Sequence, residues 1–347
     1  MSQKKAISSG QKAFEIIMTV LCCIIAFVFL VLLGARAYFR LPVSEYYAYS
    51  EQAFVIPGVN DGMIHQGLAY DSENDTFLIT GYRTGGNASQ VSVVSRASGN
   101  ELKRVNLAKA DGKAFTGHVG GITHYVDYIY VADSKGLYVY AKADFEATKS
   151  GDSVKSVGMF KTTTDDDKLR VSFTHVEGDT LYIGEFHRDP DYATPASHKY
   201  TTAAGDKHGG LILAYKLDRA ETETFGIVNN VERAYTIPDL VQGMCFDASG
   251  KIYLSTSYGA TFSHIYSYTT HKQEGNITVL GQSVPLYVLD SSTLVGDIKL
   301  APMAEEIVIV DGKLYTMCEA ATNKYIFGKF TSAKYCYATD ISKFQGK

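Results

Sequence analysis

The chain has 347 residues with a formal net charge of -4, and 46% of its residues are hydrophobic. This mild charge, without a basic stripe interleaved with aromatic residues, argues against a nucleic-acid-binding protein. The sequence holds 31 glycines, 25 tyrosines and no tryptophan. Together with the scarcity of helical periodicity, this composition favours turns and half-buried strands over a helical domain.

The first predicted element is an apolar run near the N-terminus. Residues 16–33 carry no charge, and the run is close to the ~20 residues that a bilayer requires. Three lysines precede it and two arginines follow it, which favours a cytoplasmic N-terminus. We therefore predict a cytoplasmic tail over residues 1–12, a transmembrane signal anchor over 13–35 and an extracellular remainder.

A cleaved signal peptide is the competing interpretation, because Ala35-Arg36-Ala37 has the small-x-small form of a cleavage site. The apolar run exceeds the ~7 to 15 residues usual for a signal peptide, which favours the anchor. In either case the following domain is exported, as a single-pass membrane protein or as a protein secreted after cleavage near Ala37. Residues 36–52 are predicted to form a Tyr-rich stalk.

The next elements form a passage that the chain nearly repeats. Segments 53–57, 65–71 and 78–82 return as 234–238, 242–247 and 254–258. A unit of strand, turn, strand, turn and strand that recurs along a β-rich sequence indicates a β-propeller. Weaker copies begin near residues 120, 172 and 306, and third strands with period-2 alternation follow at 90–94, 137–140, 211–215, 264–268 and 335–338.

Five unit starts predict an all-β fold, a β-propeller of five blades over residues 53–347, with six blades as the alternative. The chain ends too soon after the last third strand for a fourth strand to follow. Residues 53–57 resemble 234–238, which occupy the place of an outer strand. We therefore predict that the N-terminal strand completes the last blade and closes the ring, which removes two sheet edges.

Five cysteines occur in the sequence, and two of them lie in the apolar run. Cys245 is predicted to be a core residue. Cys318 and Cys336 lie on predicted adjacent strands of one blade. They could face each other in a disulfide, which an exported location permits, or both could be small buried hydrophobic residues.

Ligand-binding residues are expected at the mouth of the central channel, where inner strands begin and second strands end. The aligned units place nine candidates there: His65, Gln66, His118, Ser172, Glu185, His187, Gln242, Tyr258 and Glu306. The glutamine amides could instead tie neighbouring blades together, since buried polar groups need partners. A carboxylate such as Glu306 requires a cation or several donors in such a place.

Residues 185–210 show no strand or helix period, and long irregular loops of this kind are usually functional or disordered. The segment leaves the second strand of the third blade, so we predict a lid over the channel mouth. His187, His198 and His208 lie in this segment with Glu185, and these are ligand types of a zinc or similar divalent metal site. Because their spacing matches no known metal motif, hydrogen-bonded loop residues are the alternative.

The inner strands resemble those of the NHL, quinoprotein-like and gluconolactonase-like propeller superfamilies, on the residues Gln242-Gly243-Met244-Cys245-Phe246-Asp247 and Gly250-Lys251-Ile252-Tyr253-Leu254-Ser255. An anchor followed by Tyr-rich blades also resembles membrane-anchored extracellular propellers of Gram-positive bacteria. Similarity to gluconolactonase-like enzymes implies a divalent metal held by channel-facing acidic and amide side chains. Glu185 and Glu306 match this pattern, whereas no Asn-Asp pair does.

Three functions follow from these patterns. The first is a membrane-tethered module that binds a small polar ligand, a glycan or a peptide, under the 185–210 lid. The second is a metal-assisted hydrolase or lyase with Glu185 or Glu306 as general base and His118, His187 or a metal as its partner. The third is a platform whose exposed tyrosines bind a surface protein. The lack of a recognisable catalytic motif favours the first function.

Overall fold

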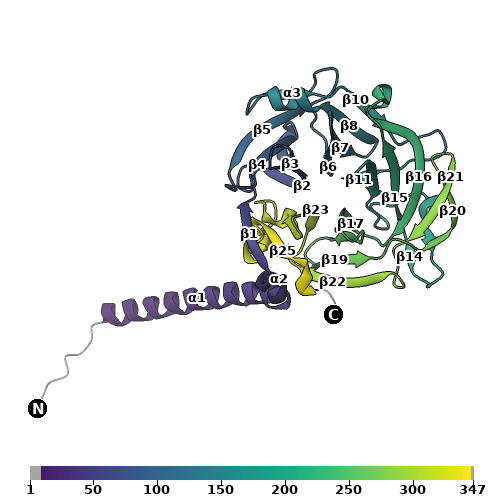
Figure 1. The fold of residues 1–347 in the computed structure, drawn as a ribbon. Coiled ribbons are helices and arrows are strands. Elements are labelled where there is room, and N and C mark those ends of the chain that lie inside the picture. The colour runs from purple at the N-terminus through teal and green to yellow at the C-terminus, as the bar shows by residue number, and fades with distance from the viewer. Residues whose placement is uncertain (1–8, 345–347) are drawn as a thin grey trace, which may run out of the picture.

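The computed structural model describes residues 9–344, so residues 1–8 of the predicted tail and residues 345–347 lie outside it. The N-terminal elements are α1 (Ser9–Arg40), η1 (Leu41–Val43) and α2 (Ser44–Ala48). The helical segment Ser9–Ala48 is long and apolar enough to cross a membrane, with a mean hydropathy of 3.3 in its most apolar part. In Figure 1, α1 projects sideways from the rim of the remaining domain.

The remaining domain is a five-bladed β-propeller, as predicted (Figure 1). The first blade comprises β2 (Met63–Asp71), β3 (Thr76–Arg83), β4 (Gln90–Ser95) and β5 (Glu101–Ala108), and β9 (Ser153–Lys155) pairs with it in parallel. The second blade comprises β6 (Ile122–Tyr125), β7 (Tyr128–Asp133), β8 (Gly136–Ala141) and β10 (Gly158–Lys161).

The third blade is the widest sheet of the ring. It comprises β11 (Val171–Glu177), β12 (Thr180–Glu185), β15 (Gly210–Leu217) and β16 (Ile227–Ile237), extended by β21 (Gln282–Val288) and β20 (Gln273–Val279). The fourth blade comprises β17 (Val241–Phe246), β18 (Ile252–Thr256), β19 (Ser263–Tyr268) and β22 (Leu294–Leu300). The 185–210 loop contains η3 (Ala196–His198) and a small hairpin of β13 (Tyr200–Thr201) and β14 (Lys207–His208).

The fifth blade confirms the predicted ring closure. It comprises β23 (Ala304–Val310), β24 (Lys313–Cys318) and β25 (Tyr335–Asp340), and β1 (Ser50–Val55) supplies the outer strand. Phe54 of β1 pairs with Cys336 of β25. Asp311 and Gly312 have φ angles of +49° and +74° in the two-residue turn between β23 and β24, and positive φ at both positions suits the right-handed twist of a hairpin.

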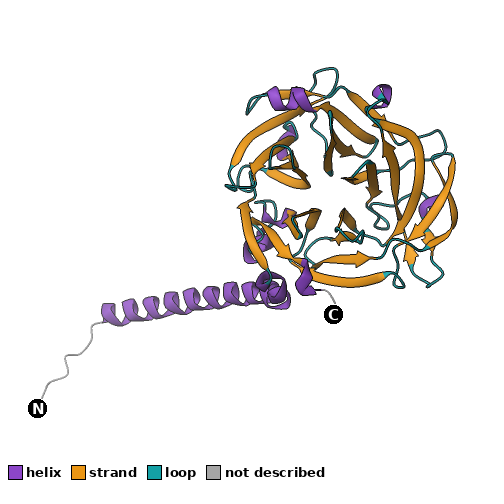
Figure 2. Ribbon diagram, viewed as in Figure 1, coloured by secondary structure: helices purple, strands orange, loops and turns teal. Residues whose placement is uncertain are grey.

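Short helices occur in the loops between strands and directly after β25 (Figure 2). They are η2 (Thr84–Gly86), α3 (Lys142–Ala147), η4 (Thr222–Thr224), η5 (Glu319–Ala321), η6 (Ile326–Phe330) and η7 (Ile341–Phe344). The predicted stalk is not a free spacer, because its last residues enter β1 at Ser50. Tyr46 is buried, and its ring lies 5.9 Å from that of Tyr337. Burial of aromatic rings therefore fastens this segment to the fifth blade.

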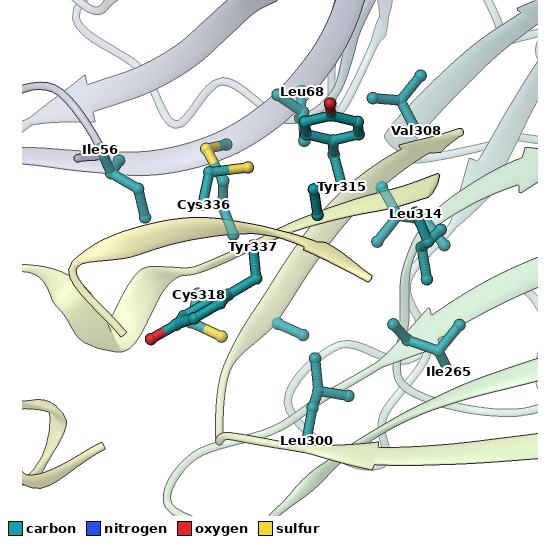
Figure 3. Close-up of a cluster of buried hydrophobic side chains, with 14 of the residues drawn as sticks. Ile56, Leu68, Ile265, Leu300, Val308, Leu314, Tyr315, Cys318, Cys336 and Tyr337 are labelled. Atoms are coloured by element: carbon teal, nitrogen blue, oxygen red, sulfur yellow. The ribbon is translucent and has the colours of Figure 1, made fainter. Parts of the chain in front are cut away.

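The hydrophobic core lies between the faces of neighbouring blades. Figure 3 shows one cluster in which Leu68 of the first blade, Ile265 of the fourth and Leu314 of the fifth come together. Cys318 and Cys336 belong to the same cluster as free, buried thiols. The register pairs Thr316 of β24 with Tyr337 of β25, so these two side chains share one face of the sheet. Cys318, two residues after Thr316, lies on that face, whereas Cys336, next to Tyr337, lies on the opposite face. This geometry favours the buried-hydrophobic interpretation over the disulfide.

Candidate functional site

The channel end of the inner strands is irregular in four of the five blades. Register shifts occur between His65 and Leu68, between Val171 and Phe173, between Val241 and Gly243, and between Ala304 and Ile307. A β-bulge re-aims side chains and backbone groups that would otherwise alternate regularly. These bulges turn the first residues of the inner strands toward the channel.

Glu306 occupies the centre of this arrangement. Its Oε2 accepts hydrogen bonds from the backbone N–H groups of Leu68 at 2.8 Å and Ile122 at 2.9 Å. Its Oε1 accepts one from Thr174 N–H at 3.0 Å. The donors come from three other blades. Burial raises the pKa of Glu306 to about 8, although the three donors act in the opposite direction.

The central carboxylate explains why glycine recurs at the start of the inner strands. A Cβ at Gly121 would lie 2.1 Å from Glu306 Oε1, and one at Gly243 would lie 2.5 Å from Glu306 Cα. A Cβ at Gly67 would lie 2.3 Å from Thr80 Oγ1. Thr80 Oγ1 itself donates to the Gly120 carbonyl at 2.7 Å, which ties the first blade to the second. Glu306 is therefore a structural hub, and the general-base role considered for it as an alternative stays a prediction.

The predicted glutamine, histidine and serine candidates form local bonds. Gln66 Nε2 donates to the carbonyl of His65 at 2.7 Å, and Gln242 Nε2 donates to Ser257 Oγ at 3.4 Å. His65 is buried against the Pro57 carbonyl, and burial lowers its pKa to about 4. Ser172 Oγ accepts from the Phe186 N–H at 3.2 Å. The glutamine amides thus bond within their own blades and do not tie neighbouring blades together.

Glu185 and His198 anchor the 185–210 loop to the third blade. His198 Nδ1 lies 2.8 Å from Glu185 Oε2, and its Nε2 lies 3.0 Å from Asp167 Oδ1. Both Glu185 and His198 are fully buried. Burial lowers the pKa of His198, but the two carboxylates outweigh it and raise the value overall. Glu185 also accepts from the N–H groups of Arg170 and Leu211, both at 3.3 Å.

The other two histidines of the loop lie in separate environments. His187 Nδ1 accepts from the Thr194 N–H at 3.2 Å, and His208 Nδ1 lies 3.1 Å from Thr236 Oγ1. Within residues 9–344, no group of three or more His, Cys, Asp or Glu side chains is placed to hold a metal ion. The four predicted ligands do not form one such group: Glu185 and His198 contact each other, whereas His187 and His208 each contact a threonine.

The loop does reach across to the fourth blade. The Arg188 guanidinium lies 3.9 Å from the centre of the Tyr258 ring, and the His187 carbonyl accepts from the Leu240 N–H at 3.0 Å. Tyr192 at the loop tip is 51% exposed and packs edge-on against Phe186 at 5.3 Å. The loop therefore leans from the third blade over the fourth and presents an aromatic ring to solvent.

A polar cluster on the opposite side of the mouth was not predicted from the sequence. We call it the mouth cluster, and its members are Tyr82, His118, Glu305, Glu319, Lys324 and Tyr325. Glu319 Oε1 accepts from the hydroxyl of Tyr325 at 3.0 Å and from that of Tyr82 at 3.3 Å. Lys324 Nζ donates to the Tyr82 hydroxyl at 2.7 Å. The His118 ring stacks on Tyr82 at 4.5 Å.

Glu305 is the unusual member of this cluster. It is 3% exposed, and within residues 9–344 its pKa is shifted by burial and by charges and not by a hydrogen bond. Its oxygens are not among the fully buried atoms without a partner, so they keep contact with the opening. Burial raises its pKa well above the ordinary value, and the charges of Glu319 and Glu306 raise it further. Burial likewise raises the pKa of Glu319. Two carboxyl groups thus share a poorly solvated site with the single ammonium group of Lys324.

The aromatic members connect the cluster to the 185–210 loop. Burial and then Glu319 raise the pKa of Tyr82, and Tyr192 of the loop adds to this effect across the opening. His118 keeps contact with solvent, but the surrounding protein and the charge of Lys324 lower its pKa to about 4. At neutral pH the mouth cluster therefore offers phenol hydroxyls, a neutral imidazole, carboxyl groups and the ammonium group of Lys324.

Two sequence signals could have revealed the mouth cluster. Glu305 directly precedes the aligned residue Glu306, and Glu319 directly follows the second strand of the fifth blade. The second signal is the long segment 319–334 between β24 and β25, which leaves the second strand as the 185–210 loop does. It carries Lys324 and Tyr325.

Another hollow, of about 420 Å³, lies at the far end of the first blade, bordered by Leu78, Leu102 and Phe145. Its lysines already have partners, and Lys103 Nζ donates to the carbonyls of Phe145 and Glu146. Lys142 Nζ lies 3.1 Å from Asp71 and 2.6 Å from Glu73. These groups are already satisfied, unlike the carboxyl group of Glu305.

No protein-family model matches the sequence, and no curated protein matches it significantly. Solved structures with similar folds include the PQQ-bound aldose sugar dehydrogenase from Streptomyces coelicolor, at 14% identity and a TM-score of 0.41 over 78% of both chains. An exo-β-1,3-galactanase from Phanerochaete chrysosporium matches at 10% identity and 0.47, over 86% of this chain and 66% of that chain. A chain of a nidogen/laminin complex matches at 14% and 0.35, over 74% and 73%. These similarities concern the fold alone.

Proposed function

We propose that the protein binds a hydroxyl-rich polar ligand, a glycan, at the channel mouth between the mouth cluster and the 185–210 loop. The observation that carries this proposal is the Glu305 carboxyl group, which is 3% exposed, is not hydrogen-bonded by the groups that shift its pKa, and is not among the fully buried atoms without a partner in residues 9–344. Its oxygens therefore keep contact with the opening. A ligand hydroxyl that donates to Glu305 would supply a hydrogen bond, worth about 0.5–1.5 kcal/mol net.

The chemistry around Glu305 suits a sugar. Carboxyl oxygens accept hydrogen bonds from hydroxyl groups, and an ammonium group donates to hydroxyl oxygens. Tyrosine rings combine an apolar face with a polar edge, and Tyr192 and Tyr258 expose such faces beside the mouth. A peptide with a polar or basic side chain is the alternative ligand, and it would compete for the same carboxyl groups.

The two alternative functions receive less support. Glu185 and Glu306, the bases proposed for a hydrolase, are each engaged by three fixed donors. A general base must be free to reach the proton that it abstracts. The tyrosines with large exposure in the described part are Tyr38, Tyr49, Tyr192 and Tyr258. Two of these flank the mouth, which favours a ligand there over a separate aromatic platform.

We further propose that α1 tethers the propeller to a membrane, with the propeller outside the cell. The length and hydropathy of the helix support this tether. The three lysines before the apolar run support this orientation, with the N-terminus in the cytoplasm. Cleavage near Ala37 would leave the same binding site on a secreted propeller.

The binding proposal is tested with the full chain in nanodiscs and a panel of soluble oligosaccharides, with polar peptides as a second panel. Binding is measured by calorimetry for the unchanged protein and for Tyr82→Phe. Removal of the Tyr82 hydroxyl breaks its bonds to Glu319 and Lys324, so we expect weaker glycan binding. Tyr138→Phe on β8 is the matched control and should bind as the unchanged protein does.

Absence of any response to the oligosaccharide panel, in a folded sample, would refute the glycan proposal. Binding of peptides alone, with the same sensitivity to Tyr82→Phe, would keep the site and change the ligand class. A glycan that binds equally well to both tyrosine variants would place the site elsewhere.

A further inference from the structure

The C-terminal end of α1 is packed against loops of two blades. The Phe39 ring stacks with Phe327 of η6 at 5.7 Å and approaches Phe262, in the loop between β18 and β19, at 6.5 Å. Tyr38 also lies 6.1 Å from Phe262. These contacts attach the helix to the fourth and fifth blades by aromatic rings, so the helix and the propeller rim meet at a defined surface.

The position of this surface relative to a bilayer follows from helix geometry. The uncharged run ends at Leu33, and a rise of about 1.5 Å per residue places Phe39 roughly 9 Å beyond it. The headgroup region on each side of the hydrocarbon core is about 5–8 Å thick. If α1 spans the bilayer, Tyr38 and Phe39 therefore lie at the outer headgroup level. Phe262 and Phe327, which contact Phe39, lie at the same level.

Exposed apolar and basic side chains lie around these rings. Ile326 next to Phe327 is 81% exposed, and Leu41 is 69% exposed. Lys299 Nζ lies 4.5 Å from the centre of the Phe262 ring. Aromatic rings concentrate at membrane–water interfaces, and long basic side chains bury their stems there while their charges reach lipid phosphates. The highly exposed Ile326, which lies next to Phe327, would also be more favourably placed at a membrane–water interface than in water.

We propose that this surface, formed by Tyr38, Leu41, Phe262, Ile326, Phe327 and Lys299, docks onto the headgroup layer of the bilayer that α1 crosses. The inference rests on the proposed tether. It also predicts the orientation of the propeller relative to the bilayer. Figure 1 looks along the channel and shows α1 leaving sideways from the rim, so the helix runs across the channel direction. The docked propeller stands on edge with its channel parallel to the membrane, and the channel mouth opens sideways along the surface.

The absence of tryptophan from the sequence makes a direct test available. Three full-length variants each introduce one tryptophan: Ile326→Trp in the proposed docking surface, Phe27→Trp in the apolar helix and Val157→Trp in the second blade, across the ring. Val157 is 44% exposed, so its variant is a matched surface control. Each is reconstituted in nanodiscs with lipids that carry a quencher at the headgroup or deep in the acyl chain.

We expect the reporter at position 326 to lose most of its emission to the headgroup quencher, and the reporter at position 27 to the acyl-chain quencher. The reporter at position 157 should keep its emission with both. Quenching at position 27 without quenching at position 326 would overturn the docking inference and leave the tether intact. Absence of quenching at both position 27 and position 326 would overturn the tether and the docking together.

The contribution of Lys299 to the docking is measured in the same nanodiscs. Lys299→Gln, combined with the reporter at position 326, should reduce quenching in nanodiscs that contain anionic lipid, because the attraction to phosphate is lost. Lys149→Gln, in the loop that follows α3, is the control and should leave the quenching unchanged. Equal quenching in all three proteins would remove Lys299 from the docking surface.

Discussion

The centre and the mouth of the channel use neighbouring carboxyl groups in opposite ways. Glu306 at the centre is bonded by backbone N–H groups from three blades. Glu305 at the mouth is buried beside Glu319 and has no such partner in the described chain. Satisfied buried polar groups stabilise and specify a fold, whereas the Glu305 carboxyl group keeps contact with the opening. Two adjacent residues of β23 thus have different surroundings, one bonded to three other blades and the other accessible to the ligand that we propose.

The largest expected effect concerns the central carboxylate. Glu306→Gln places an amide N–H₂ group against backbone donors and leaves at least one buried N–H without an acceptor. We expect a loss of about 2–4 kcal/mol in the free energy of unfolding. Chemical denaturation measures it, with Glu177→Gln at the exposed end of β11 as the control. A loss within ~0.5 kcal/mol, as for ordinary surface changes, would show that Glu306 is not the hub.

The same residue predicts how stability depends on pH. Burial raises the folded-state pKa of Glu306 to about 8, so the folded protein holds this proton more tightly than the unfolded chain does. The contribution that proton binding by Glu306 makes to folding stability is therefore complete below the unfolded pKa of about 4.5, and it is lost as the pH rises toward 8. The difference in unfolding free energy between the unchanged protein and Glu306→Gln should shrink over this range. A difference that grows with pH would contradict the raised pKa.

The glycine contacts provide the next test of the channel centre. Gly121→Ala would place a Cβ 2.1 Å from Glu306 Oε1 and 2.7 Å from the Thr174 nitrogen. Overpacking of this kind costs about 1–3 kcal/mol. Gly210→Ala is the control, since its Cβ would meet no atom closer than 3.4 Å. Thermal melting should separate the two variants, and equal melting temperatures would argue against a crowded hub.

A smaller, local effect is expected in the 185–210 loop. His198→Ala removes the ring that joins Glu185 to Asp167 and should open the loop without unfolding the blades. The local cost is about 1–3 kcal/mol, and hydrogen exchange of residues 186–209 should increase accordingly. His264→Ala, which removes a half-exposed ring paired with Asp297, should leave that exchange unchanged. Unchanged exchange in His198→Ala would show that the loop has another anchor.

Much of the fold could be predicted from the sequence because its signals are local and repeated. Period-2 alternation, the turn residues and the similarity of segments 53–57 and 234–238 led to five blades and the closing strand. The stalk prediction did not include the burial of Tyr46, which depends on Tyr337, far away in the chain. Such a contact leaves no periodic signal.

The site was only partly predictable, because its chemistry depends on where each side chain points and on which backbone N–H groups it meets. The sequence placed Glu306, His118 and Tyr258 near the mouth, but it could not show that three N–H groups satisfy Glu306. The bulge between Ala304 and Ile307, which gives Glu305 and Glu306 different surroundings, is also a property of the folded sheet. The histidines near Glu185 suggested a metal site, yet their rings face different partners in the fold.

The most direct test of this account is the effect of Glu305→Gln on ligand binding. Thermal shift with the oligosaccharide identified by calorimetry is measured for the unchanged protein and for Glu305→Gln, with Glu177→Gln as the control. We expect Glu305→Gln to melt close to the unchanged protein and to lose the ligand-induced shift. A shift that survives in Glu305→Gln would contradict the assignment of the unpartnered carboxyl group to ligand binding.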